Sequence, residues 1–77
     1  DNMCTLLRAL EAKYEAEILK AKANIDVYVR SSVGIGEHPD LVEAIDTQLQ
    51  ALADAEEKLT VLQSHYGAEL RSHYAGR

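Results

Sequence analysis

The sequence contains no tryptophan, no phenylalanine, one cysteine and one proline. The single cysteine, Cys4, excludes a disulfide within the chain, and no group of Cys and His residues has the spacing of a zinc site. Without Trp and Phe the chain lacks the usual platforms for stacking single-stranded nucleic acid, although four Tyr are present. It also has no run of ~18 apolar residues. We therefore expect no cofactor, no metal, no nucleic-acid partner and no membrane-spanning segment.

These absences matter because the chain has only 77 residues. Below ~80 residues a single hydrophobic core rarely supplies more than ~3–5 kcal/mol, and small domains usually add a disulfide or a metal. With both missing, the remaining sources of stability are regular helix packing, a partner, or self-association. A lone cysteine also favours a reducing cytoplasm as the location.

Basic residues are outnumbered, with 8 Lys and Arg against 13 Asp and Glu and a net charge of −5. The charges of residues 1–33 cancel, residues 34–66 carry −6, and the last eleven residues carry +1. A surface that follows nucleic-acid phosphates is not expected from such a chain.

The strongest break in the sequence lies between Ser31 and Asp40, where Gly34, Gly36 and Pro39 interrupt segments rich in Ala, Leu, Glu, Lys and Gln. Asp40 and Glu43 have the spacing of a helix N-cap and its capping-box partner. We predict a single all-α domain, an antiparallel two-helix hairpin resembling a coiled coil. Its helices are expected at about residues 3–33 and 40–66, with a loop at 34–39 and a tail at 67–77 in which Gly67 ends or loosens the helix.

One stripe of each predicted helix is apolar when residues are placed at ~100° intervals. In the first helix the spacing follows an eleven-residue pattern of ~3.67 residues per turn, which favours nearly straight or slightly right-handed packing over a strict seven-residue coiled coil. Folding the chain around the loop pairs residues whose numbers add to roughly 73. The expected interhelical seam comprises Leu7, Leu10, Tyr14, Ile18, Ala21, Ile25 and Val29 with Leu41, Ile45, Leu49, Leu52, Ala55, Leu59, Leu62, Tyr66 and Leu70.

The first helix carries a second apolar face opposite this seam, whereas Val61 is the only large apolar residue on the outside of the second helix. A helix that is apolar on two opposite faces is expected to have neighbours on both. The alternative is that alanine is simply a good helix former at the surface, which leaves Leu19 and Val27 unexplained. We predict that hairpins pair through their first helices into a four-helix or larger homo-oligomer. The predicted interface is Ala9, Ala12, Ala16, Leu19, Ala23 and Val27.

Acidic residues gather on the loop and on the outside of the second helix. Negative charge near a helix N-terminus is stabilising, but this effect fades after one turn and does not account for Asp54 and Glu57. Solvation of an outer face is one interpretation, and docking of a basic protein is the other. The predicted acidic face is Glu37, Asp40, Glu43, Asp46, Asp54 and Glu57.

No motif indicates catalysis. Gly34-Ile35-Gly36 follows a helix rather than a strand and precedes acidic residues, so we interpret it as loop geometry. His38 has no nucleophile or orienting partner in view. His65, Glu69 and His73 would share one face of a continuous helix, but i to i+8 spans ~12 Å, too far for one ion. We expect the protein not to be an enzyme.

The stretch from Val33 through Gly34, His38 and Pro39 to Asp46, followed by the Ala/Glu/Lys/Leu segment to Leu62, resembles small helical-hairpin proteins of T4-like tailed bacteriophages over residues 10–66. The resemblance implies a virus-encoded accessory protein in a bacterial cytoplasm or a virus particle, and it implies no catalytic residues.

Together these features favour a self-associating structural or protein-interaction module. The alternative hypothesis is an acidic adaptor or inhibitor that binds a basic host protein as a monomer.

Overall fold

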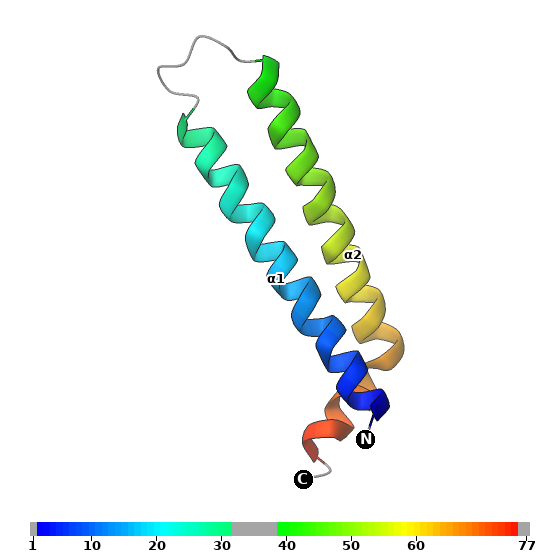
Figure 1. The fold of residues 1–77 in the computed structure, drawn as a ribbon. Helices are drawn as coiled ribbons and strands as arrows, with labels where there is room; N and C mark the ends of the chain where they lie inside the picture. Colours follow the sequence, from blue (N-terminus) through cyan, green and yellow to red (C-terminus); the bar gives the residue numbers. More distant parts are fainter. Residues whose placement is uncertain (1, 32–38, 76–77) are drawn as a thin grey trace.

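The computed structural model describes the backbone of residues 2–31 and 39–75 and the side chains of residues 4–31 and 40–71. Two helices account for this backbone, α1 (Asn2–Ser31) and α2 (Pro39–Ala75). They run antiparallel and side by side, so the last turn of α1 and the first turn of α2 lie at one end, and the first turn of α1 and the last turn of α2 lie at the other (Figure 1). The predicted all-α hairpin is confirmed.

The start of α2 differs slightly from the prediction. Pro39 is the first helical residue rather than the last of the loop, and Asp40 lies in the first turn, not at the N-cap. Proline suits this first position because its missing N–H has no partner within the helix there. The predicted end of the first helix at residue 33 and the loop residues Gly34 and His38 lie outside the described residues.

Three hydrogen bonds between side chains and the opposite helix define the antiparallel register. Asn24 Nδ2 donates to Gln48 Oε1 at 3.1 Å, and Gln63 Nε2 donates to Glu11 Oε2 at 3.4 Å. The Cys4 thiol donates to the Glu69 carbonyl oxygen, with Sγ and O 3.4 Å apart. The residue numbers in these pairs add to 72, 74 and 73, so the predicted register is confirmed.

The repeat along the seam differs from the predicted eleven-residue pattern. In α1 the buried and half-buried positions include a series with alternating spacings of three and four, which is a seven-residue repeat. Leu10 and Val29, both expected in the seam, are 38% and 52% exposed, whereas Glu11 and Tyr28 are half-buried. On α2, Leu49 is 50% exposed and Gln48 is half-buried in its place. The series in α1 is Cys4, Leu7, Glu11, Tyr14, Ile18, Ala21, Ile25 and Tyr28.

The core is thin. Among the described side chains only Ala21, Ala55, Leu62 and Leu70 are buried. The molecule measures 56 × 19 × 15 Å, and its radius of gyration of 16.9 Å exceeds the ~11.5 Å of a compact chain of this length. Its accessible surface of 5636 Å² is likewise larger than the ~4650 Å² expected for a compact monomer of this mass. Two helices alone therefore leave much apolar surface in contact with water.

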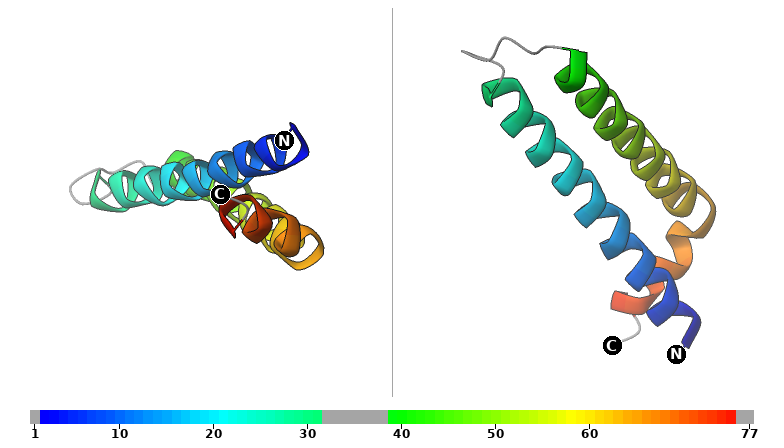
Figure 2. Two further views of the ribbon diagram at one scale, coloured as in Figure 1. Left: turned by 90° about the horizontal axis from the view of Figure 1, so that it is seen from below. Right: turned by 45° about the horizontal axis from the view of Figure 1, so that its top comes forward.

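The backbone of α2 bends at Tyr66, where φ is −127° and ψ is 18°. The non-helical backbone at Tyr66 lies where the helix was predicted to end or loosen, and a further helical segment follows to Ala75. The bent segment passes beneath the hairpin, close to the first turns of α1 (Figure 2). Leu70, in this segment, is 5% exposed, whereas Tyr66, which was expected in the seam, is 46% exposed. The kink buries the leucine and turns the tyrosine outward.

Candidate interaction surfaces

The predicted oligomer interface lies on α1, on the side away from α2, and is called here the outer face of α1. All six of its residues are exposed, and the two large side chains, Leu19 and Val27, are 67% and 57% exposed. Leu6 adds a further large apolar side chain to the exposed surface of α1, at 65%. The predicted exposure of these six residues is therefore confirmed, and their role as an interface stays a prediction. Its residues are Ala9, Ala12, Ala16, Leu19, Ala23 and Val27.

The polar residues of α1 form ion pairs along the helix. Lys13 Nζ lies 3.0 Å from Glu17 Oε2, and Arg30 Nη2 lies 2.9 Å from Asp26 Oδ2, both at i,i+4 spacing. The hydrogen bond to Glu17, and then the charge of that carboxylate, raise the pKa of Lys13. Because these pairs are exposed, they contribute little to stability. Lys13 and Arg30 thus each have an acidic partner on their own helix.

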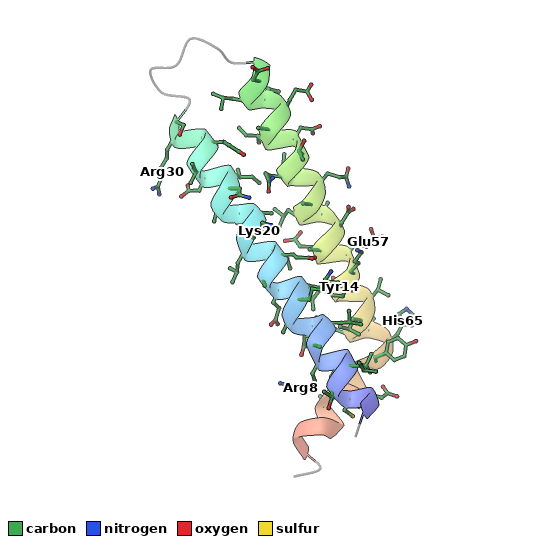
Figure 3. The ribbon with its side chains drawn as sticks, viewed as in Figure 1. Arg8, Tyr14, Lys20, Arg30, Glu57 and His65 are labelled. Carbon is green, nitrogen blue, oxygen red and sulfur yellow. The ribbon has the colours of Figure 1, made fainter. Side chains whose placement is uncertain are left out.

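The acidic face is exposed as predicted for every residue whose side chain the structure describes. Asp54 accepts a hydrogen bond at 2.9 Å from Gln50 Nε2, one turn earlier on α2, and its side chain is exposed. Glu57 points into solvent from the same helix (Figure 3). Glu37 lies outside the described residues. The described members of this face are Asp40, Glu43, Asp46, Asp54 and Glu57.

The two helices present opposite net charge to the solvent. Among the described side chains of α1, four cations and two acids are exposed, which gives +2. Among those of α2, seven acids and two cations are exposed, which gives −5. The hairpin is therefore electrically polarised across its width. The exposed charges are Lys13, Glu15, Lys20, Lys22, Asp26 and Arg30 on α1, and Asp40, Glu43, Asp46, Asp54, Glu56, Glu57, Lys58, Glu69 and Arg71 on α2.

A groove runs along one side of the hairpin between α1 and α2, and we call it the side groove. It consists of two hollows of about 370 and 330 Å³ that adjoin at Asp54 and Lys58. Lys58 Nζ lies 5.8 Å from the centre of the Tyr14 ring, which lies between the helices (Figure 3). The apolar hollow is lined by Leu10, Tyr14, Asp54, Glu57, Lys58, Val61, Leu62 and Tyr66. The polar hollow is lined by Glu17, Lys20, Ala21, Gln48, Ala51, Asp54 and Lys58.

Sequence reasoning missed the side groove because it placed Leu10 and Tyr66 inside the seam. The one available signal was Val61, which was identified as an apolar exception on the outside of α2. In the structure Val61 is 49% exposed and lies with Leu10 and Tyr66 in the apolar hollow. What looked like an isolated exception belongs to an apolar patch of three large side chains.

Of the residues considered for chemistry, the structure describes the side chains of Cys4, His65 and Glu69. No group of three or more His, Cys, Asp or Glu residues has metal-binding geometry among those residues. His65 lies on the side of α2 away from α1 (Figure 3), and the kink at Tyr66 separates it from Glu69. Cys4 is half-buried, with its thiol directed to the Glu69 carbonyl oxygen. The side chains of His38 and His73 lie outside the described residues.

Comparisons of the chain with family models, curated proteins and solved structures give no match. Within the helical residues that the structure describes, neither α1 nor α2 has a stretch apolar enough to cross a bilayer. The resemblance to bacteriophage hairpin proteins stays a prediction.

Proposed function

We propose that this protein is a non-enzymatic structural module that assembles with copies of itself and uses the outer face of α1 as a contact surface. The observation that carries the proposal is the exposure of Leu19 and Val27 on that face, beside a core of only four buried residues in the described chain. Full burial of a Val or Leu side chain is worth ~1.5–3 kcal/mol. Self-association would thus add stability comparable to the ~3–5 kcal/mol available to a small isolated core.

The small residues of the outer face support the same proposal. Four of its six positions are alanine, so a neighbouring helix could approach closely without displacing side chains. Leu19 and Val27 would then enter spaces between side chains of the neighbour. A protein that acts through such a contact surface needs no catalytic group.

Leu19→Glu is expected to reduce the molecular mass of the assembly to that of the monomer. The substitution places a carboxylate in the middle of the contact, where burying an unpaired charge is costly. The mass would be measured by sedimentation velocity or multi-angle light scattering at micromolar concentration, with circular dichroism to show that the helices persist. Thr60→Glu is the matched control, since it adds the same charge at an exposed position of α2. A wild-type protein that is monomeric and folded at this concentration would refute the proposal.

The second candidate function is an acidic adaptor that binds a basic protein as a monomer. The observation that favours it is the exposed net charge of −5 on the described part of α2. Charge reversal by Asp54→Lys together with Glu57→Lys is expected to weaken capture of a basic helical peptide at least tenfold, and added salt should weaken the wild-type complex. Isothermal titration calorimetry at two salt concentrations measures both effects. Binding that survives the charge reversal would count against the adaptor.

The proposed setting is a bacteriophage accessory protein in the bacterial cytoplasm or the virus particle. Neighbouring genes for virion proteins would support this setting, and neighbouring metabolic genes would count against it.

A further inference from the structure

We propose that the side groove is the surface on which the outer face of α1 from a second copy docks, so that copies associate head to tail. This inference rests on the proposed self-association and adds the complementary half of the contact. It makes each hairpin carry two different surfaces, one that inserts and one that receives.

The apolar hollow of the side groove has the properties of a receiving surface. Its volume of about 370 Å³ lies between Leu10 of α1 and Val61 of α2, at the end of the hairpin where α2 bends. Leu10, Val61 and Tyr66 are 38%, 49% and 46% exposed. These are large apolar side chains from both helices, gathered at one place and left in water. Docking an apolar helix face would remove them from water together.

The outer face of α1 has the spacing of an inserting helix. Ala12, Ala16, Leu19 and Ala23 follow one another at intervals of four, three and four residues, so they line one side of the helix. Helices that dock in apolar grooves present their anchors at this spacing. Leu19 is the large anchor. The alanines allow the docking helix to come close to the two helices that border the groove.

Charge favours the side groove, rather than a second outer face, as the surface that receives the outer face of α1. Symmetric pairing of α1 with α1 would bring together two helices on each of which the exposed charges of the described side chains sum to +2. Docking α1 of one copy beside α2 of another instead brings a helix with an exposed net charge of +2 toward one with an exposed net charge of −5. Asp54 and Glu57 lie at the edge of the apolar hollow on the second helix. Lys13 and Lys20 lie together on one flank of the outer face and can approach these carboxylates, although Lys13 also pairs with Glu17 on its own helix. Complementary charge of this kind selects the partner surface and the register.

Head-to-tail contact between unlike surfaces has a structural consequence. Each copy that docks through its outer face leaves its own side groove open for another copy. Such contacts close into a ring when the rotation between copies allows it and otherwise extend as a filament. The assembly therefore grows beyond the pair of hairpins that symmetric contact would give.

The test is complementation between two variants, each lacking one surface. Leu19→Glu removes the inserting surface and keeps the groove, and Val61→Glu blocks the groove and keeps the inserting surface. Each variant alone is expected to be a folded monomer. An equimolar mixture is expected to form a 1:1 dimer that grows no further, because the only intact pair of surfaces is then used. Sedimentation velocity measures the masses, and circular dichroism checks that each variant retains its helices.

The controls separate this inference from the proposed function. Thr60→Glu, next to Val61 but absent from the residues lining either hollow, should assemble like the wild type. A wild-type oligomer whose mass Val61→Glu does not change overturns the side groove as the receiving surface and leaves self-association standing with symmetric α1 contact. A monomeric wild type overturns both. Loss of assembly in both variants without a dimer in the mixture also overturns head-to-tail docking.

Discussion

Replacing Leu62 with alanine is expected to leave most of the protein unfolded at 25 °C. Leu62 is 6% exposed and is one of only two leucines buried in the described chain. Removing a buried leucine side chain costs ~2–5 kcal/mol, because apolar contacts are lost and a cavity remains. A core of this size supplies only ~3–5 kcal/mol in total. Urea denaturation followed by circular dichroism at 222 nm measures the loss as a lower midpoint or as missing helix signal in buffer.

The matched control for Leu62→Ala is Thr60→Ala, two residues away on the exposed side of the same helix. This control should shift the unfolding free energy by no more than ~0.5 kcal/mol. Both variants must be compared at one protein concentration, since association adds to the apparent stability of the folded state. If Leu62→Ala were as stable as the control, the seam would not be the main source of stability, and contacts between copies would have to supply it.

The hairpin and its register could be predicted because their signals are local and strong. Gly34 and Pro39 interrupt two segments of good helix formers, and folding the chain around this break fixes which residues face each other. The pairs Asn24–Gln48 and Glu11–Gln63 lie within one residue of the predicted register. A short connection between long helices leaves little freedom for any other alignment.

The repeat within the seam could not be predicted by hydrophobicity alone. Leu10 and Leu49 were assigned to the seam because they are leucines, yet Glu11 and Gln48 are less exposed. Amide and carboxylate groups can occupy such positions when their polar atoms find partners, as the Asn24–Gln48 hydrogen bond shows. With only two helices, a half-buried polar side chain also keeps part of its surface in water. The cost of placing it in the seam is therefore small.

The apolar hollow of the side groove includes Tyr66, at the kink of α2, for which the sequence offers only Gly67 as a signal. Whether a glycine ends a helix, bends it or does neither depends on what the following residues can contact. Here Leu70 is buried beyond the bend, and that tertiary contact favours the bent form. The exposure of the outer face of α1, by contrast, could be predicted from helical periodicity. Surfaces on one helix are readable from sequence, whereas a surface shared by two helices requires their exact geometry.

Ala55→Glu is expected to disrupt the hairpin even more strongly than Leu62→Ala. Ala55 is 1% exposed, the lowest value among the buried apolar residues that the structure describes. A glutamate there must either lose the hydration of its carboxylate or separate the helices, and an unpaired buried charge shifts its protonation or unfolds the protein. We expect the variant to lose its cooperative thermal transition in circular dichroism at pH 7.

Two further variants show whether charge or size causes the effect of Ala55→Glu. Ala53→Glu introduces the same residue at an exposed position of the same helix and should change stability by no more than ~0.5 kcal/mol. Ala55→Leu adds volume without charge and should cost ~1–3 kcal/mol through overpacking. A glutamate at position 55 that costs no more than leucine would mean that the helices part easily there. The seam would then open to solvent at its most enclosed point, and close packing at Ala55 could not be what holds the two helices in register.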